Sequence, residues 1–181
     1  MNYCKQAPGQ TRPDIAAVRE FAKAGWTLDD MHGMPHWLRV ERNGMLLATG
    51  GVDVTVVRLF AYLHDKCRQT NDRDLCHGHR AAEMLPSLRG SLLAGLDDGA
   101  FDKLVTACRL HSVEKCTGDI TIDTCFDADR LDLGRVGIIP APDKMATEMG
   151  RYFASDAAAF CRACAEFELS NRQARDTDIT Y

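Results

Sequence analysis

The sequence of 181 residues lacks several features that mark familiar classes of protein. No apolar run approaches the roughly 20 residues that a membrane-spanning helix needs. The opening residues, MNYCKQAPGQTRP, have no hydrophobic signal core. Basic residues are not in excess, because 22 Lys and Arg face 26 Asp and Glu, for a formal net charge of −4. Phosphate backbones attract positively charged chains, so we expect no nucleic-acid partner. The lack of a long apolar run and of a signal core leads us to expect a cytoplasmic protein without membrane association.

Strand signals are also scarce, since alternating polar and apolar residues joined by two-residue turns are absent. Helical periodicity between capping residues recurs instead. It predicts helices within residues 12–26, 34–51, 54–65, 75–85, 97–112, 120–134 and 155–169. The Val and Thr content of 54–65 leaves a strand possible there. The sequence therefore predicts an all-α fold in one domain spanning residues 1–181.

Several of the expected helix ends depend on single residues. Asp53, Asp74 and Ser155 are suitable N-terminal caps for the segments that follow them. Pro86 is expected to close the helix of 75–85, and Gly134 to stop the helix of 120–134. A C-terminal extension at about 142–170 is expected to add helices to the bundle.

All six histidines fall between residues 32 and 111. Residues i, i+3, i+4 and i+7 share a helix face, which puts His36, His64 and His111 on the apolar stripes of three different helices. One such histidine is usually an ordinary core residue. Three of them, with the carboxylate of Asp65 beside His64, indicate a site for a divalent transition metal.

A further carboxylate is expected from CFDADRLD, where Asp127 and Asp129 are two residues apart. Two residues correspond to about 200° around a helix, so one face cannot present both side chains. Asp129 and Asp132 can share a face. Helix geometry alone does not choose between Asp127 and Asp129.

The ordered motifs HWLRVERNG, LHD, HGHRAA, ACRLHS and DADRLD resemble those of the HD-domain metal-dependent phosphohydrolases. The resemblance covers about residues 32–137, which would be the HD core, and is nearest to a small, largely uncharacterised subgroup. It implies an HD-domain-like helical bundle with a metal site in its core. The implied ligands are His36, His64, Asp65 and Asp129. The ADRL context decides for Asp129, and Asp127 is the second choice.

Within that resemblance, His77 and His111 match positions that hold a second metal or contact phosphate in some members. The short spacing from Asp65 to His77 favours a single ion. His77 and His111 would then contact the phosphate or support the metal ligands through hydrogen bonds. The ion could be Mn, Fe, Co, Ni or Zn. His32 is either a group supporting the site or a solvated loop residue, and His79 is expected at the surface.

A metal and a phosphate would also require cationic groups, and Lys66, Arg68, Arg73 and Arg80 follow the His64–Asp65 pair. Lys66 and Arg68 are the expected phosphate clamps. The function expected is hydrolysis of a phosphate ester or anhydride of a small metabolite or nucleotide. The alternatives are a di-iron HD-type oxygenase, or a non-catalytic ligand-binding or regulatory protein with a structural metal.

Overall fold

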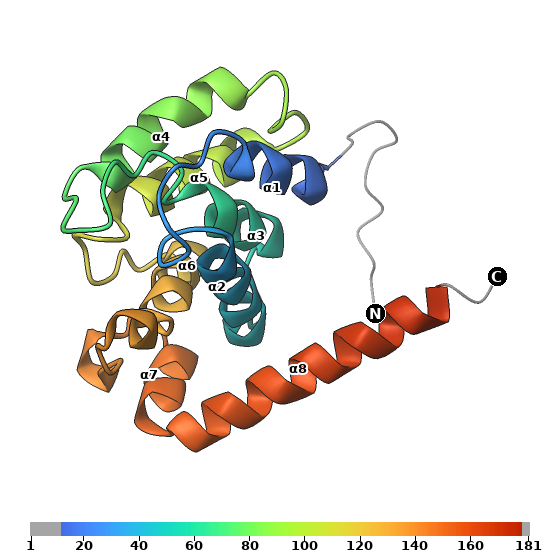
Figure 1. The fold of residues 1–181 in the computed structure, drawn as a ribbon, viewed down its shortest axis with the longest axis vertical. Helices are drawn as coiled ribbons and strands as arrows, with labels where there is room; N and C mark the ends of the chain where they lie inside the picture. Colours follow the sequence, from blue (N-terminus) through green and yellow to red (C-terminus); the bar gives the residue numbers. More distant parts are fainter. Residues whose placement is uncertain (1–11, 179–181) are drawn as a thin grey trace.

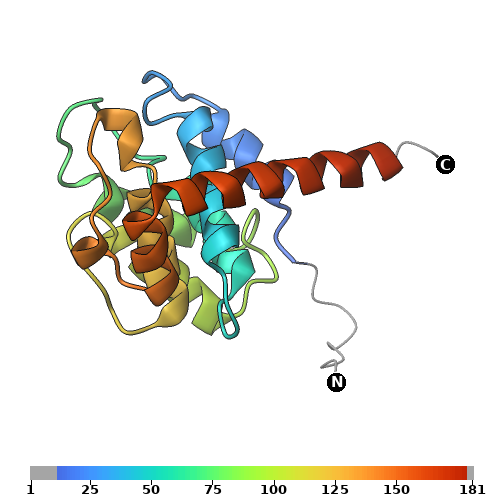
Figure 2. The same cartoon turned by 90° about the horizontal axis from the view of Figure 1, so that it is seen from below.

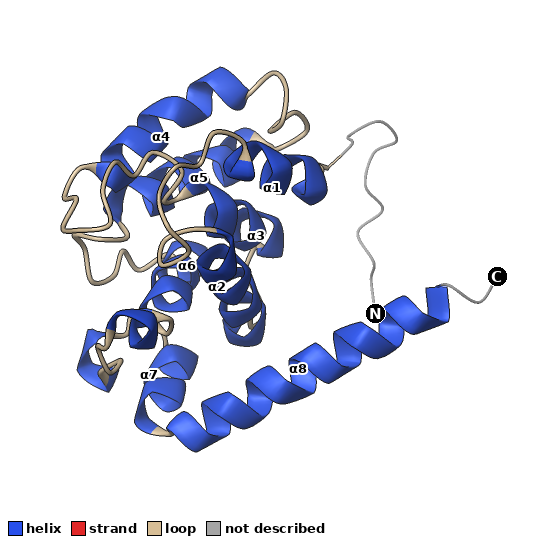
Figure 3. Cartoon of the chain, in the orientation of Figure 1, coloured by secondary structure: helices blue, strands red, loops and turns tan. Residues whose placement is uncertain are grey.

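A computed structural model describes residues 12–178 of the chain, and the side chains of residues 12–174. Over this range the fold is entirely helical, without a strand, which confirms the all-α prediction (Figure 3). The helices are α1 Ile15–Lys23, α2 Met34–Leu47, α3 Val54–Leu63, α4 His77–Leu88, α5 Asp98–Leu110, α6 Ile120–Arg130, α7 Glu148–Ser155 and α8 Ala157–Asp178, with 3₁₀ helices η1 Leu133–Val136 and η2 Pro142–Lys144.

Helix α3 lies at the centre of the bundle, packed against α1, α2, α5 and α6 (Figure 1). Seven of its ten residues are buried, as expected of a helix that is apolar on every side. Asp53 begins it by accepting hydrogen bonds from the backbone N–H groups of Thr55 and Val56. Helix α3 ends at Leu63, so the chain delivers His64 and Asp65 directly into the core.

Three expected helix ends are corrected by the structure. Pro86 lies inside the last turn of α4, which continues to Leu88. Helix α6 ends at Arg130, before Gly134. The residue with a left-handed backbone is Gly137, with a φ of 76°, which ends η1. Asp156, not Ser155, accepts the capping hydrogen bond of α8, from Ala159. The cap of α8 and the left-handed terminator therefore lie one and three residues beyond the residues expected to supply them.

The C-terminal residues form η2, α7 and the long helix α8. Helix α8 packs against α7 and α2 and extends past the rest of the bundle (Figures 1 and 2). An ion pair of 2.9 Å between Arg42 and Glu168 joins α2 to α8. Among the described helices, none combines the length and apolar character needed to cross a membrane.

Candidate metal centre

Five helices converge on one cluster of imidazoles and carboxylates. Helix α2 supplies His36 from its buried face, and α6 supplies Asp129. Two histidines, His64 and His111, occupy the C-terminal caps of α3 and α5. The carbonyl end of a helix is its negative pole, which favours a cation nearby. The remaining members are Asp65, which follows α3, and His77, which begins α4.

The hydrogen bonds of the imidazoles fix their tautomers. Each of four histidines donates its Nδ1–H to an oxygen that can only accept. The pairs are His36 with Oδ2 of Asp132 at 2.7 Å, His64 with the carbonyl of Phe60 at 3.0 Å, His111 with the carbonyl of Cys108 at 2.8 Å, and His77 with the carbonyl of Asp74. In the neutral form, every Nε2 atom therefore presents a lone pair.

Those lone pairs face one another. The Nε2 atoms of His36 and His64 are 3.2 Å apart, and those of His77 and His111 are 2.8 Å apart. A proton between two nitrogens would satisfy them, but burial lowers the pKa of His36 and brings that of His111 to about 3. Both distances are short enough for two nitrogens to share an ion at the usual ~2.1 Å. The imidazoles therefore fit a divalent metal.

The carboxylates complete two sets of ligands. The first cluster consists of His36, His64, Asp65 and Asp129. In it, Oδ2 of Asp65 lies 3.7 Å from Nε2 of both histidines, and Oδ1 of Asp129 lies 3.4 Å from Nε2 of His36. Oδ1 of Asp129 is buried and accepts no hydrogen bond. Nη1 of Arg135, a cationic group, lies 3.8 Å away from it, beyond hydrogen-bond distance. A buried carboxylate oxygen without a hydrogen bond is unfavourable unless a cation faces it closely. This oxygen fits a metal better than it fits a closed hydrogen-bond network.

The second cluster consists of Asp65, His77 and His111. Oδ1 of Asp65 lies 3.2 Å from Nε2 of His77, so the two oxygens of this carboxylate face different histidine pairs. Ligand atoms of His64, His111 and Asp129 also lie within 4.8 Å of one another. The first and second clusters are therefore adjacent, with Asp65 between them.

Gly78 allows the second cluster to form. A Cβ atom at this position would come within 2.4 Å of the carbonyl oxygen of Cys108 and 2.9 Å of the His111 ring. Backbone cannot yield as a flexible side chain does. The absent side chain lets α4 approach α5 closely enough for His77 to meet His111.

The charge states match those of metal ligands. Burial alone would raise the pKa of Asp129, but the charges of His64, His36 and Arg135 bring it to about 2. The pKa of Asp65 is likewise held well below its usual value: burial opposes ionisation, and the surrounding histidines outweigh it. Both carboxylates are therefore ionised near neutral pH, as carboxylate ligands of a metal must be.

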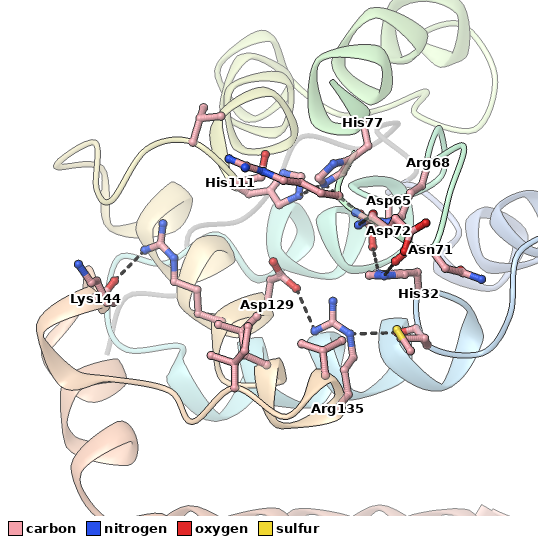
Figure 4. A pocket seen from close by; sticks show the side chains of 18 of the residues that line it. His32, Asp65, Arg68, Asn71, Asp72, His77, His111, Asp129, Arg135 and Lys144 are labelled. Carbon is pink, nitrogen blue, oxygen red and sulfur yellow. Dashed lines mark hydrogen bonds and ion pairs between the residues drawn. The ribbon is translucent and has the colours of Figure 1, made fainter. Parts of the chain in front are cut away.

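A pocket of about 810 Å³ opens onto this site (Figure 4). Six cationic residues line it, against four acidic residues of which two are Asp65 and Asp129. The cationic residues are Arg68, Arg73, Lys115, Arg130, Arg135 and Lys144. Nη1 of Arg68 lies 3.6 Å from Asp65, and Nη1 of Arg135 lies 3.8 Å from Asp129. The pocket therefore places positive charge around the ligands.

The structure brings together most of the residues singled out in the sequence. His36, His64, Asp65, His77, His111 and Asp129 meet at the clusters, and Arg68 lines the pocket. His32, buried, lies with Nδ1 3.4 Å from Oδ2 of Asp65 and is therefore not a solvated loop residue. His79 is exposed and pairs with Glu83, as expected of a surface residue.

Lys66 does not come to the pocket. Its Nζ donates to the backbone carbonyls of Ala22 and Ala24 at the end of α1. A lysine is well placed there, because the last carbonyls of a helix have no partner within the helix. The expectation that Lys66 and Arg68 form a joint clamp is corrected, because the two side chains point to different parts of the bundle.

Asp127 also has another partner. Its carboxylate accepts hydrogen bonds from the backbone N–H groups of Ala146 and Thr147 and from the hydroxyl of Thr147, each at 2.8 Å. Thr147 is the N-terminal cap of α7. Asp127 thus fastens the C-terminal extension to the bundle, while Asp129 lies among the histidines.

Asp132 and Arg135 make contacts at the site that the sequence did not predict. Asp132 accepts from His36 and forms a bidentate pair with Arg39, at 2.6 and 3.0 Å. Its spacing of three residues from Asp129 was the available signal, because both then lie on one helix face. Arg135 lies 3.8 Å from Asp129 and lines the pocket.

Comparisons of the chain with protein-family models, with curated proteins and with solved structures found no match.

Proposed function

We propose that the protein is a metal-dependent phosphohydrolase acting on a small phosphorylated substrate. The observation that carries this proposal is the arrangement of four histidine Nε2 lone pairs around Asp65 and Asp129, at the floor of a cationic pocket. When bound, a divalent ion supplies Lewis-acid chemistry: it activates water near neutral pH and polarises a phosphoryl oxygen. The resemblance of the sequence to HD-domain enzymes supports the same reading.

The chain's own residues would divide the work. The first cluster, on helices held by the core, would hold an ion, and Asp132 keeps His36 in the tautomer that a ligand needs. Arg68 and Arg135 face the pocket beside the two carboxylates. Their planar guanidinium groups suit the equatorial oxygens of a phosphoryl group, where negative charge develops.

The reaction balances as a simple hydrolysis. The oxygen of water forms a bond to phosphorus, and the bond between phosphorus and the ester oxygen breaks. The proton lost by water is transferred to the leaving oxygen, so the products are an alcohol and inorganic phosphate. His77 and His111 lie on the pocket side of the site, where either can contact the phosphate or a second ion.

The number of ions follows from Asp65. The sequence spacing favours one ion, whereas the contacts favour two, because the oxygens of Asp65 face separate histidine pairs. Asp65 would thus serve as a ligand in both clusters. We propose one ion in each cluster, chosen from Mn, Fe, Co, Ni and Zn.

One observation also favours a second function. A complete second cluster is what a di-iron oxygenase would require of His77 and His111. The cationic lining of the pocket favours the hydrolase, because it compensates phosphate charge. Iron content separates the two: a di-iron centre with a mixed-valence signal favours the oxygenase, and turnover of phosphate esters with Mn or Co favours the hydrolase.

The test is elemental analysis of the purified protein, followed by a screen of phosphorylated metabolites with the ion that is found. We expect bound transition metal and release of inorganic phosphate. Asp129→Ala should lose the ion of the first cluster and abolish phosphate release. Asp72→Ala is the matched control, since Asp72 is an exposed acid of the same pocket with no place in either cluster. Occupied clusters without turnover of any ester would overturn the hydrolase and favour a binding protein.

A further inference from the structure

Part of the pocket lining is apolar. Apolar side chains line it from three separate segments of the chain: Met31 before α2, Val113 after α5, and Leu133, Val136 and Ile138 around η1. Met31, Val113 and Ile138 are 40, 60 and 53% exposed. Exposed apolar side chains are ordinary when scattered, but a group that gathers around one opening indicates a binding surface.

The apolar wall is held in place by backbone hydrogen bonds. The N–H of Ile138 donates to the carbonyl of Leu133 at 3.2 Å, closing the turn around Gly137. The N–H of Val113 donates to the carbonyl of Leu110 at 3.0 Å. Arg135, in the same segment as Leu133 and Val136, donates from its Nε to the carbonyl of Met31 at 3.0 Å. This hydrogen bond joins two of the three segments that carry the apolar residues. A prearranged surface loses little conformational entropy when a ligand binds.

The pocket offers no aromatic side chain. Among the described residues that line it there is no Phe, Tyr or Trp. Proteins that hold nucleobases commonly stack them on aromatic rings, whereas Met, Val, Leu and Ile suit flexible aliphatic groups. The pocket thus combines cationic side chains with aliphatic ones.

We infer that the ligand is an aliphatic phosphate ester, with its phosphate at the clusters and its hydrocarbon part against Met31, Val113 and Ile138. This inference rests on the proposed function for the chemistry of the ester, but the binding preference is separable from turnover. Each methylene that leaves water contributes about 0.8 kcal/mol, which corresponds to about fourfold in affinity.

The experiment measures binding by calorimetry, using alkyl phosphonates, whose carbon–phosphorus bond is not hydrolysed. Purified protein with Mn²⁺ is titrated with methyl, propyl and hexyl phosphonate. We expect affinity to rise by about fourfold per added methylene until the wall is covered. Equal affinity for methyl and hexyl phosphonate would overturn the inference.

Variants locate the effect on the wall. The double variant Val113→Ser with Ile138→Ser should weaken hexyl phosphonate by about tenfold and leave methyl phosphonate unchanged. Both positions are exposed, so the fold should tolerate serine. Leu169→Ser is the matched control, since Leu169 is equally exposed but lies on α8 outside the pocket. A loss of hexyl phosphonate binding as large in the control would overturn the assignment.

The outcomes separate this inference from the proposed function. Chain-length-dependent binding without hydrolysis of hexyl phosphate overturns the hydrolase and leaves the aliphatic site standing. Hydrolysis of generic esters with no dependence on chain length does the reverse. A further arm offers vesicles of phosphatidylcholine with phosphatidic acid: cosedimentation assigns the aliphatic phosphate to a lipid surface, and its absence assigns it to a soluble ester.

Discussion

The two clusters are built from similar side chains but differ in their access to the pocket. His36 and His64, in the first cluster, are fully buried and do not line the pocket. His77 and His111, in the second, are nearly buried but lie in the pocket wall. Asp65 belongs to both. The first cluster, which is closed, suits a firmly held ion. The second cluster, which lines the pocket, can also contact substrate.

Removing the shared ligand should have the largest effect. Asp65→Ala takes a carboxylate oxygen from each cluster, and we expect it to lose both ions and to reduce activity to background. His64→Ala should lose metal and activity through the first cluster. Elemental analysis and phosphate release check both variants, with circular dichroism to show that the helices remain. Full metal content in Asp65→Ala would contradict the shared role.

The two neighbouring aspartates of α6 should respond in opposite ways. Asp129→Ala should lose the ion of the first cluster with little effect on the extension. Asp127→Ala should keep the metal but destabilise the protein by about 1–3 kcal/mol, because the buried N–H of Thr147 and the partly buried N–H of Ala146 lose their acceptor. Urea unfolding and metal analysis separate the two. Metal loss in Asp127→Ala alone would reverse the assignment.

Gly78→Ala should separate the clusters from each other. The added methyl group forces α4 away from Cys108 and moves His77 from His111, so we expect the second ion to be lost and the first retained. Metal stoichiometry should fall from two ions to one per chain. Gly90→Ala is the matched control, because nothing lies near its Cβ position. Unchanged stoichiometry in Gly78→Ala would show that the close approach is dispensable.

Arg68 and Lys66 should differ in kinetics and in stability. Arg68→Ala should raise KM by about tenfold, the scale of one charge-assisted contact, with metal content unchanged. Lys66→Ala should leave kinetics unchanged and lower the free energy of unfolding by about 1 kcal/mol, through the carbonyls at the end of α1. An increase in KM for Lys66→Ala would return it to the pocket.

The stability of the metal-free protein should also depend on pH. Burial lowers the pKa of His36 and brings that of His111 to about 3, from an ordinary value of 6.5. Between these values the unfolded chain binds more protons than the folded chain, so the metal-free protein should lose stability as pH falls from 7 toward 4. Thermal unfolding of metal-free protein across this range checks the direction. Rising stability on acidification would contradict neutral imidazoles.

Much of the fold could be predicted from the sequence because its signals are local. Asp53 begins α3 through hydrogen bonds to residues two and three positions away. The apolar stripes carrying His36, His64 and His111 likewise follow from helix period alone. Helix ends were less certain, since Asp156 and Gly137 satisfy the backbone as well as the residues expected to do so.

The rest depended on contacts between distant segments. Asp127 and Asp129 are both acids on α6, and only the position of Thr147 shows which of them is engaged elsewhere. Lys66 and Arg68 are both cations near Asp65, and only the end of α1 distinguishes them. The local sequence around Met31, Val113 and Ile138 does not predict that these three residues line the same pocket. Such facts belong to tertiary packing.

The most direct test of the account is calorimetric titration of metal-free protein with Mn²⁺. The paired lone pairs and the two faces of Asp65 predict saturation at two ions per chain in the native sequence, and no tight binding in Asp65→Ala. An absence of binding to the native chain, or binding that Asp65→Ala leaves unchanged, would contradict the metal centre.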